Sequence, residues 1–145
     1  MRRPQGDDGT IGILIVGFTA VLLLLVAVVV DVSAVVLARR GAASAADGAA
    51  IAAAQQLNTA SLYANGLDGE IPLSPEKVAD VVAQYAADAA QGQPGLALEP
   101  SVDEAGTTAT VVATRRLTLP FTGWLTTKEV TVTAVARAKA PLVAP

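Results

Sequence analysis

One apolar run, from Ile11 to Val30, constrains this chain more than any other feature. The run contains no charged residue and no proline, and Asp7, Asp8 and Asp31 flank it. About twenty residues of α-helix span about 30 Å, which is the thickness of the hydrocarbon core of a bilayer. Because the run lacks the polar stripe of a surface helix, it predicts a single membrane-spanning helix near the N-terminus.

The same run is longer than the apolar core of a signal peptide, which has about 7–15 residues. Residues 43–45 (Ala-Ser-Ala) resemble a cleavage site, but Arg39 and Arg40 precede them, so we expect the helix to be retained. Arg2 and Arg3 nearly balance Arg39 and Arg40 in the positive-inside count. A tail as short as residues 1–9 stays easily in the cytoplasm, which predicts that the C-terminal domain lies outside the cytoplasmic membrane.

The composition excludes several kinds of site. The chain has no cysteine and no histidine, which excludes disulfides, thiolate or imidazole metal sites and histidine-based acid–base catalysis. Residues 41–145 hold ten acidic and six basic side chains, a net charge of −4, and few aromatic residues, which argues against nucleic acid as a partner. We therefore expect no catalysis, no cofactor and no small-molecule substrate.

The helix is expected to continue well beyond the apolar run. Residues 32–38 are again largely apolar, and residues 41–57 are dominated by alanine, the strongest helix former. We predict one helix from about residue 10 to about residue 57, with residues 10–38 in the membrane and residues 39–57 beyond it. Gly41 and Gly48 each cost this helix about 1 kcal/mol relative to alanine.

The remaining residues, 58–145, predict a small α+β domain. After a loop ending near Leu73, Ser74 and Pro75 read as the N-cap and first turn of a second helix, whose apolar stripe comprises Val78, Val81, Val82, Tyr85, Ala86 and Ala89. Alternating apolar residues predict a strand over 130–139, with residues 107–119 as its partner. Residues 96–103, interrupted by Pro100, predict a weaker strand at the edge of this antiparallel sheet.

Part of this pattern resembles a known family. Asp31, the Ala38-Arg39-Arg40 segment and the alanine-rich block over residues 45–54 are similar to the TadE/TadG-like proteins of Flp (Tad) pilus assembly. The Phe121–Leu125 segment and the Thr/Val-rich strand over 130–138 resemble the C-terminal part of these proteins more loosely. The resemblance implies a pilin-like α+β fold and a bitopic protein that helps to build a thin surface pilus or is a minor pilin in it.

The chain departs from processed prepilins at one position. Such proteins carry a glycine at the cleavage point and a glutamate five residues later. Gly9 and Thr10 are the candidate cleavage pair here, but the corresponding position is Leu14 and the apolar run contains no glutamate. The sequence therefore resembles the unprocessed, membrane-retained branch of the family.

Four charged residues near the membrane are candidates for interaction. Asp31 either marks the membrane–water interface, in contact with water, or pairs with a cationic partner inside a helical assembly, and we favour the first reading. Arg39 and Arg40 either bind lipid phosphates or simply anchor the helix at the head groups, and we favour anchoring. Asp47 is expected to be a solvated residue.

Two apolar groups are also candidates for interaction. The small-residue helix face, which includes Ala46, Ala49, Ala50 and Ala53, packs either on other pilus subunits or on the chain's own sheet, and the sequence does not decide between them. Phe121 and Trp124 either close the end of a small core or form an exposed anchor for a partner or the membrane surface. We favour closure of the core.

These features predict a membrane-anchored pilus-assembly or minor-pilin-like component whose partners are the lipid bilayer and other pilus subunits. The alternative is a membrane-tethered adaptor domain, unrelated to pili, that captures a peptide or an envelope polymer. A carboxylate-dependent hydrolase is disfavoured, because Asp103 and Glu104 would point to opposite faces of a strand or form part of a turn.

Overall fold

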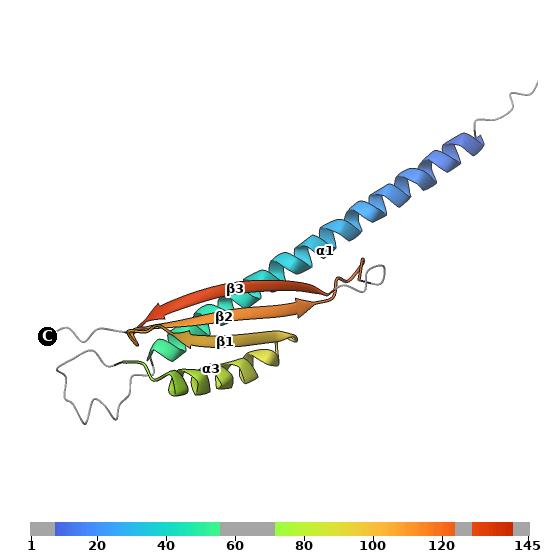
Figure 1. The fold of residues 1–145 in the computed structure, drawn as a ribbon. Helices are drawn as coiled ribbons and strands as arrows, with labels where there is room; N and C mark the ends of the chain where they lie inside the picture. Colours follow the sequence, from blue (N-terminus) through green and yellow to red (C-terminus); the bar gives the residue numbers. More distant parts are fainter. Residues whose placement is uncertain (1–7, 56–71, 124–128, 141–145) are drawn as a thin grey trace, which may run out of the picture.

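The computed structural model describes residues 8–55, 72–123 and 129–140, and it confirms the predicted α+β class (Figure 1). Its five elements are α1 (Asp8–Gln55), α3 (Pro75–Ala90), β1 (Leu96–Val102), β2 (Thr108–Leu117) and β3 (Val130–Lys139). The N-terminal half of α1 projects beyond the other elements, whereas its C-terminal half lies along the sheet (Figure 1). The predicted end of this helix at residue 57 lies outside the described residues.

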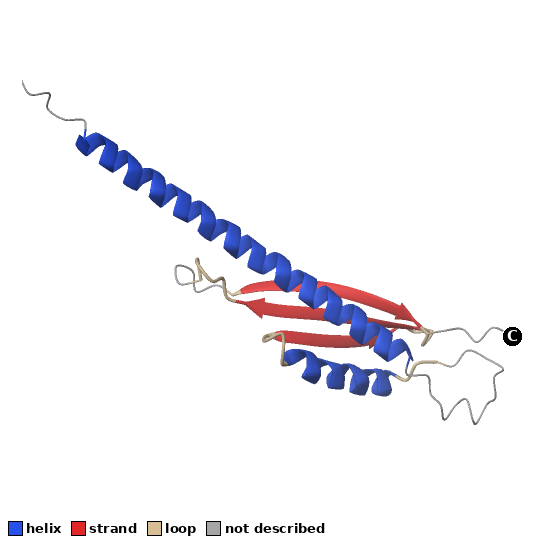
Figure 2. Ribbon diagram, turned by 180° about the vertical axis from the view of Figure 1, so that it is seen from behind, coloured by secondary structure: helices blue, strands red, loops and turns tan. Residues whose placement is uncertain are grey.

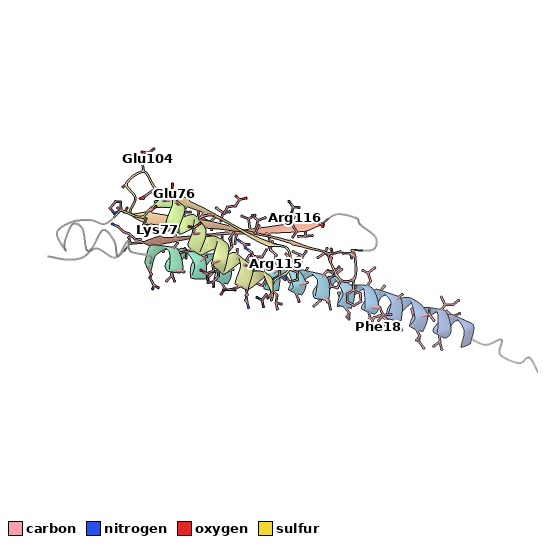
Figure 3. All side chains as sticks on the ribbon, turned by 90° about the horizontal axis from the view of Figure 1, so that it is seen from below. Phe18, Glu76, Lys77, Glu104, Arg115 and Arg116 are labelled. Atoms are coloured by element: carbon pink, nitrogen blue, oxygen red, sulfur yellow. The ribbon has the colours of Figure 1, made fainter. Side chains whose placement is uncertain are left out.

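The projecting half of α1 is long and apolar enough to cross a membrane. Its large side chains are exposed: Leu14 is 72% exposed. Phe18 is 69% exposed and lies on the projecting part of the helix (Figure 3). The hydroxyls of Thr19 and Ser33 donate to the carbonyl oxygens of residues 15 and 29 within the helix, each at 2.8 Å. Both hydroxyls are thus satisfied without water, as a lipid environment requires.

The sheet is antiparallel, with strand order β1-β2-β3. β2 lies in the centre, where Val111 pairs with Pro100 on one side and with Ala136 on the other. The prediction that β1 is an edge strand is confirmed, and this position suits Pro100, which has no N–H to donate to a further strand.

Both helices cover the same face of the sheet (Figure 2). The core between the layers is built largely from small side chains: Ala42, Ala46, Ala49 and Ala53 of α1 are 0% exposed and recur at helical spacing. Opposite them lie buried residues of β2 (Ala109, Val111, Ala113) and of α3 (Val78, Val82). Alanine at these positions brings the backbone of α1 close to the sheet.

Helix α3 forms where its apolar stripe predicts, with Val78 and Val82 buried. Ser74 is at the N-cap position with an extended backbone, but its side chain makes no capping hydrogen bond. The prediction that Ser74 is the N-cap residue is therefore confirmed. Pro75 occupies the first turn, where the missing N–H costs nothing.

The β1–β2 connection is a turn organised by Asp103. Its carboxylate accepts hydrogen bonds from the backbone N–H groups of Thr107 (2.7 Å) and Thr108 (2.9 Å), while Gly106 adopts a positive φ of 69°. These bonds, led by the one from Thr108, lower the pKa of Asp103 below its ordinary value of 3.8. Asp103 is thus a turn former. This outcome agrees with the second of the two alternatives for Asp103 and Glu104, a place in a turn and not in a strand.

Candidate functional site: the junction between the apolar helix and the sheet

Asp31 lies where the projecting helix meets the rest of the fold. Among the described residues of α1, it is the first from the N-terminus to be buried, with 5% of its surface exposed. Its Oδ1 accepts a hydrogen bond from the N–H of Phe121 at 2.9 Å. Its Oδ2 accepts two more from Thr122, from the backbone N–H at 2.9 Å and from the hydroxyl at 2.6 Å.

The partner of Asp31 is a single helical turn after β2, closed by a hydrogen bond from the N–H of Gly123 to the carbonyl oxygen of Leu119 at 3.1 Å. The first N–H groups of such a turn have no acceptors within the turn. The carboxylate of Asp31 on α1 supplies the missing acceptors. Asp31 therefore acts as an N-cap, although it lies 90 positions before Phe121 in the chain. We call Asp31 and residues 119–123 the Asp31 junction.

This geometry corrects one part of the favoured reading of Asp31, its contact with water. The side chain is largely buried and, among the described residues, its carboxylate is bound by Phe121 and Thr122 and not by a cation. It satisfies a polar backbone segment from a distant part of the chain. Sequence reasoning missed Thr122 altogether, although the Pro-Phe-Thr-Gly composition of residues 120–123 signals a turn.

Phe121 is 48% exposed, so the expectation that it closes the core was wrong for this residue. The N–H of Phe121 is bound to Asp31, and this bond fixes the backbone without burying the ring. Trp124, the other residue of that prediction, lies outside the described residues.

The apolar surface of α1 ends at different heights on different sides of the helix. On the side that faces the sheet it ends at Asp31, and Ala38 is buried there. On the flanks of α1, Val32 and Leu37 are 57% and 67% exposed, and the exposed Arg39 and Arg40 follow. The apolar surface therefore extends further along the flanks of α1 than along the side that faces the sheet.

The small-residue helix face packs on the chain's own sheet. Ala46, Ala49, Ala50 and Ala53 are each at most 1% exposed and belong to the core with β2 and β3. In this fold these four alanines are not accessible to other subunits. This burial excludes the alternative in which they pack on other pilus subunits. Asp47, between them on the outer side of α1, is exposed as expected.

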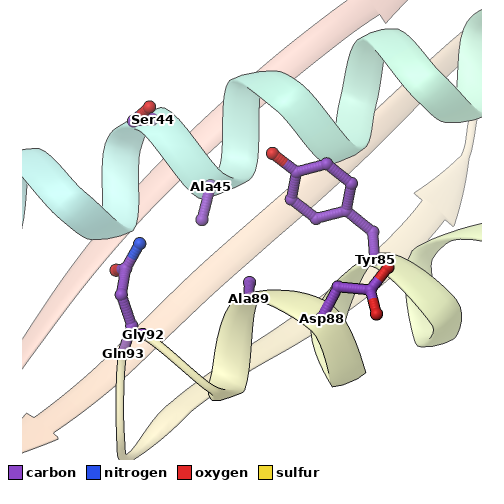
Figure 4. A pocket seen from close by; sticks show the side chains of 7 residues that line it. All are labelled: Ser44, Ala45, Tyr85, Asp88, Ala89, Gly92 and Gln93. Atoms are coloured by element: carbon purple, nitrogen blue, oxygen red, sulfur yellow. The ribbon is translucent and has the colours of Figure 1, made fainter.

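An open hollow of about 510 Å³ lies between α1 and α3 (Figure 4). It is lined by Ser44 and Ala45 of α1 and by Tyr85, Asp88, Ala89 and Gln93 of α3 and the turn that follows it. Near this hollow, Oε1 of Gln93 and Nε of Arg115 are buried, and neither atom has a hydrogen-bond partner within the described part of the chain. Among the described residues, no three Asp or Glu side chains are grouped closely enough to hold a metal ion.

Comparison with known proteins bears on α1 alone. No curated protein and no solved structure matches the chain. A family described as "Putative Flp pilus-assembly TadE/G-like" matches residues 9–56, which span nearly all of α1, including Asp31, the Arg39-Arg40 pair and the small-residue helix face. The resemblance to this family is thus confirmed over residues 9–56, and this match supports a pilus-assembly-related role.

Proposed function

We propose that this protein is a single-pass component of the cytoplasmic membrane that serves a Flp/Tad-type pilus, as an assembly factor or minor pilin, through contacts between helices and between domains. The family match over residues 9–56 is the observation that carries the proposal. The structure supports it with an exposed apolar helix of bilayer length that continues without a break into the α+β domain.

The proposed topology places residues 1–9 in the cytoplasm, residues 10–38 in the membrane and residues 39–145 outside. The exposed apolar side chains of α1 reach Leu37, and the exposed Arg39 and Arg40 follow, which supports a boundary near residue 38.

Asp31 lies about 10 Å below residue 38 along the helix, so the Asp31 junction reaches the level of the lipid head groups on the side of the sheet. The half-exposed ring of Phe121 then meets the lipid head groups, where aromatic side chains are favoured. Arg39 and Arg40 lie just above the boundary on α1, at a height suited to phosphate contacts. We expect no cleavage between Gly9 and Thr10, because Leu14 replaces the carboxylate typical of processed prepilins.

The test is a count of surface filaments by electron microscopy on cells that lack the gene and on complemented cells. A matched pair of variants separates anchoring from sequence effects: Val21→Asp with Leu22→Asp places two charges at the centre of the span, each costing about 3 kcal/mol, whereas Val21→Ile with Leu22→Ile keeps it apolar. We expect filaments with the isoleucine pair and none with the aspartate pair. Filaments at normal number in the absence of the gene would overturn the proposal.

The second candidate, a membrane-tethered adaptor unrelated to pili, is favoured by one observation, the exposed aromatic ring of Phe121 beside the apolar helix. Unchanged filaments together with carbonate-resistant membrane association would favour this candidate. Release of the protein by carbonate would exclude both candidates, since each requires a spanning helix.

A further inference from the structure

One face of the sheet is bare in the described structure. Both helices lie on the opposite face, so alternate residues of the three strands point away from them (Figures 1 and 2). This outer sheet face is rich in threonine, and the cross-strand pair Val112–Val135 lies at its centre, with Val135 57% exposed. The short, β-branched side chains of this face form an even surface on which another even surface can pack.

The outer sheet face is basic in an otherwise acidic domain. Arg116, Arg137 and Lys139 are exposed on it, and Glu99 is the one carboxylate that the three strands place there; the exposed Glu129 directly precedes β3. Figure 3 shows Arg116 directed away from the helices, in contrast to its neighbour Arg115. The residues of the three strands thus give this face a net charge of +2, whereas residues 41–145 together have −4.

The opposite side of the domain carries acidic residues on α3. Glu76 and Asp80 are exposed on the side of the helix that faces away from the buried Val78 and Val82, and the exposed Ala83, Gln84 and Ala87 follow them on that side. Lys77 and Asp88 lie on the flanks of this surface, which we call the outer α3 face. The domain therefore carries opposite charges on its two broad sides.

The charges on the two sides lie at matching heights. The N–H of Leu73, just before α3, donates to the carbonyl oxygen of Gly106, just before β2, at 2.7 Å, so both elements start at the same end. Glu76 and Asp80 lie within about 8 Å of the start of α3. Lys139 pairs with Thr108 and Arg137 pairs with Thr110, which places both cations within about 7 Å of the start of β2.

We propose that a second copy of this chain packs on the outer sheet face through its outer α3 face, side by side in the same bilayer. Arg137 and Lys139 then lie opposite the partner's Glu76 and the partner's Asp80 with no shift in height, as two copies anchored in one membrane require. The inference rests on the proposed membrane anchoring. Because the two surfaces differ, the contact is heterologous and repeats from copy to copy rather than closing as a symmetric dimer.

The size of the surface explains why the membrane is needed. Three strands about 4.8 Å apart and eight residues long present about 350 Å² on each copy, or about 700 Å² in total. That is below the roughly 1,000 Å² expected of a stable complex in solution. Confinement of both copies to one bilayer raises their effective concentration and makes a weak contact sufficient. The exposed charges on the two faces determine how the two copies align more than how tightly they bind.

The absence of cysteine makes cross-linking a clean test. Full-length Arg137→Cys and full-length Asp80→Cys chains, with different tags, are reconstituted together in phospholipid vesicles and oxidised. We expect the mixed disulfide to exceed either homodimer at least fivefold. Ile51→Cys serves as the matched control, because Ile51 is 51% exposed at a similar height on α1 but lies on neither surface. It should form little disulfide with Arg137→Cys.

Charge reversal tests the register. Lys139→Glu in the Arg137→Cys chain should lower the mixed disulfide at least threefold, and Glu76→Arg in the Asp80→Cys chain should restore it. Equal cross-linking of the Asp80→Cys and Ile51→Cys chains, or dominant homodimers, would overturn the inference. Carbonate extraction of the same vesicles separates the two proposals: protein that resists extraction but fails to cross-link refutes the stacking alone, whereas extracted protein refutes the anchoring and the stacking with it.

Discussion

Gly48 offers the sharpest test of how α1 packs on α3. A Cβ at this position would overlap the hydroxyl of Tyr85 and would lie 2.8 Å from Cζ of the same ring. In an unobstructed helix, Gly→Ala stabilises by about 1 kcal/mol. Here the gain competes with overpacking against Tyr85, which typically costs about 1–3 kcal/mol.

The two effects predict the sign of the change. The ring of Tyr85 borders the hollow between α1 and α3, so part of the overlap is relieved by rotation of the ring into that space (Figure 4). We therefore expect Gly48→Ala to destabilise the domain by about 0–2 kcal/mol, the difference between the overpacking cost and the helix gain.

Tyr85→Leu provides the matched background, because leucine keeps apolar contact near the helix and lacks the hydroxyl, Cζ and Cε atoms. In this background Gly48→Ala should stabilise by about 1 kcal/mol, which gives a coupling energy of about 1–3 kcal/mol between the two positions. The sign of the Gly48→Ala effect thus reverses between the two backgrounds.

The assay is urea and thermal unfolding of the full chain in detergent micelles, followed by circular dichroism and by the fluorescence of the single tryptophan. For a domain of this size, about 1 kcal/mol shifts Tm by about 4–8 °C, so a double-mutant cycle resolves the expected coupling. Equal stabilisation by Gly48→Ala in both backgrounds would refute the contact with Tyr85. Equal destabilisation would place the obstruction elsewhere, against the sheet.

Three further outcomes are expected. Asp31→Ala should speed amide hydrogen exchange at Phe121 while leaving the centre of β2 protected; unchanged exchange would mean that the carboxylate does not cap the turn. Ala46→Leu should lower the free energy of unfolding by about 1–3 kcal/mol, whereas Ala87→Leu on the exposed side of α3 should stay within about 0.5 kcal/mol, and equal effects would contradict the packing of α1 on the sheet. Since folding lowers the pKa of Asp103, its contribution to stability is complete above its ordinary pKa of 3.8 and disappears as the pH falls below that value through the lower folded pKa; Asp103→Asn should flatten this part of an acid-unfolding curve, and an unaltered curve would exclude the contribution.

The sequence predicts those elements whose residues repeat with a local period. The stripe on α3 and the alternation in β3 identify both elements, because each residue's environment follows from its neighbours along the chain. Residues 96–103 are identified as an edge strand by Pro100, a single residue with a strong backbone constraint.

The sequence does not predict contacts that depend on distant pairing. The small-residue helix face is evident in the sequence. The pattern does not show whether the chain's own sheet or another subunit packs on this face. Asp31 is misjudged for a related reason: its acceptor oxygens meet N–H groups 90 positions later only when β2 and α1 lie side by side. Ser74 shows the converse, a local signal that identifies the N-cap of α3 correctly from the residues beside it.

The continuity of α1 links the proposed anchor to the proposed contact between copies. The helix runs from Asp8 to Gln55 without proline, its C-terminal half is fixed in the core, and the Asp31 junction fixes it again at the edge of the sheet. With two separate attachments about 23 Å apart along one helix, measured from Asp31 to Ala46, the domain cannot swing about its anchor. The tilt of α1 in the bilayer therefore also sets the angle of the outer sheet face. A substitution in the apolar part of α1 that alters this tilt should alter cross-linking between the domains, although the substituted residue touches neither cross-linked surface.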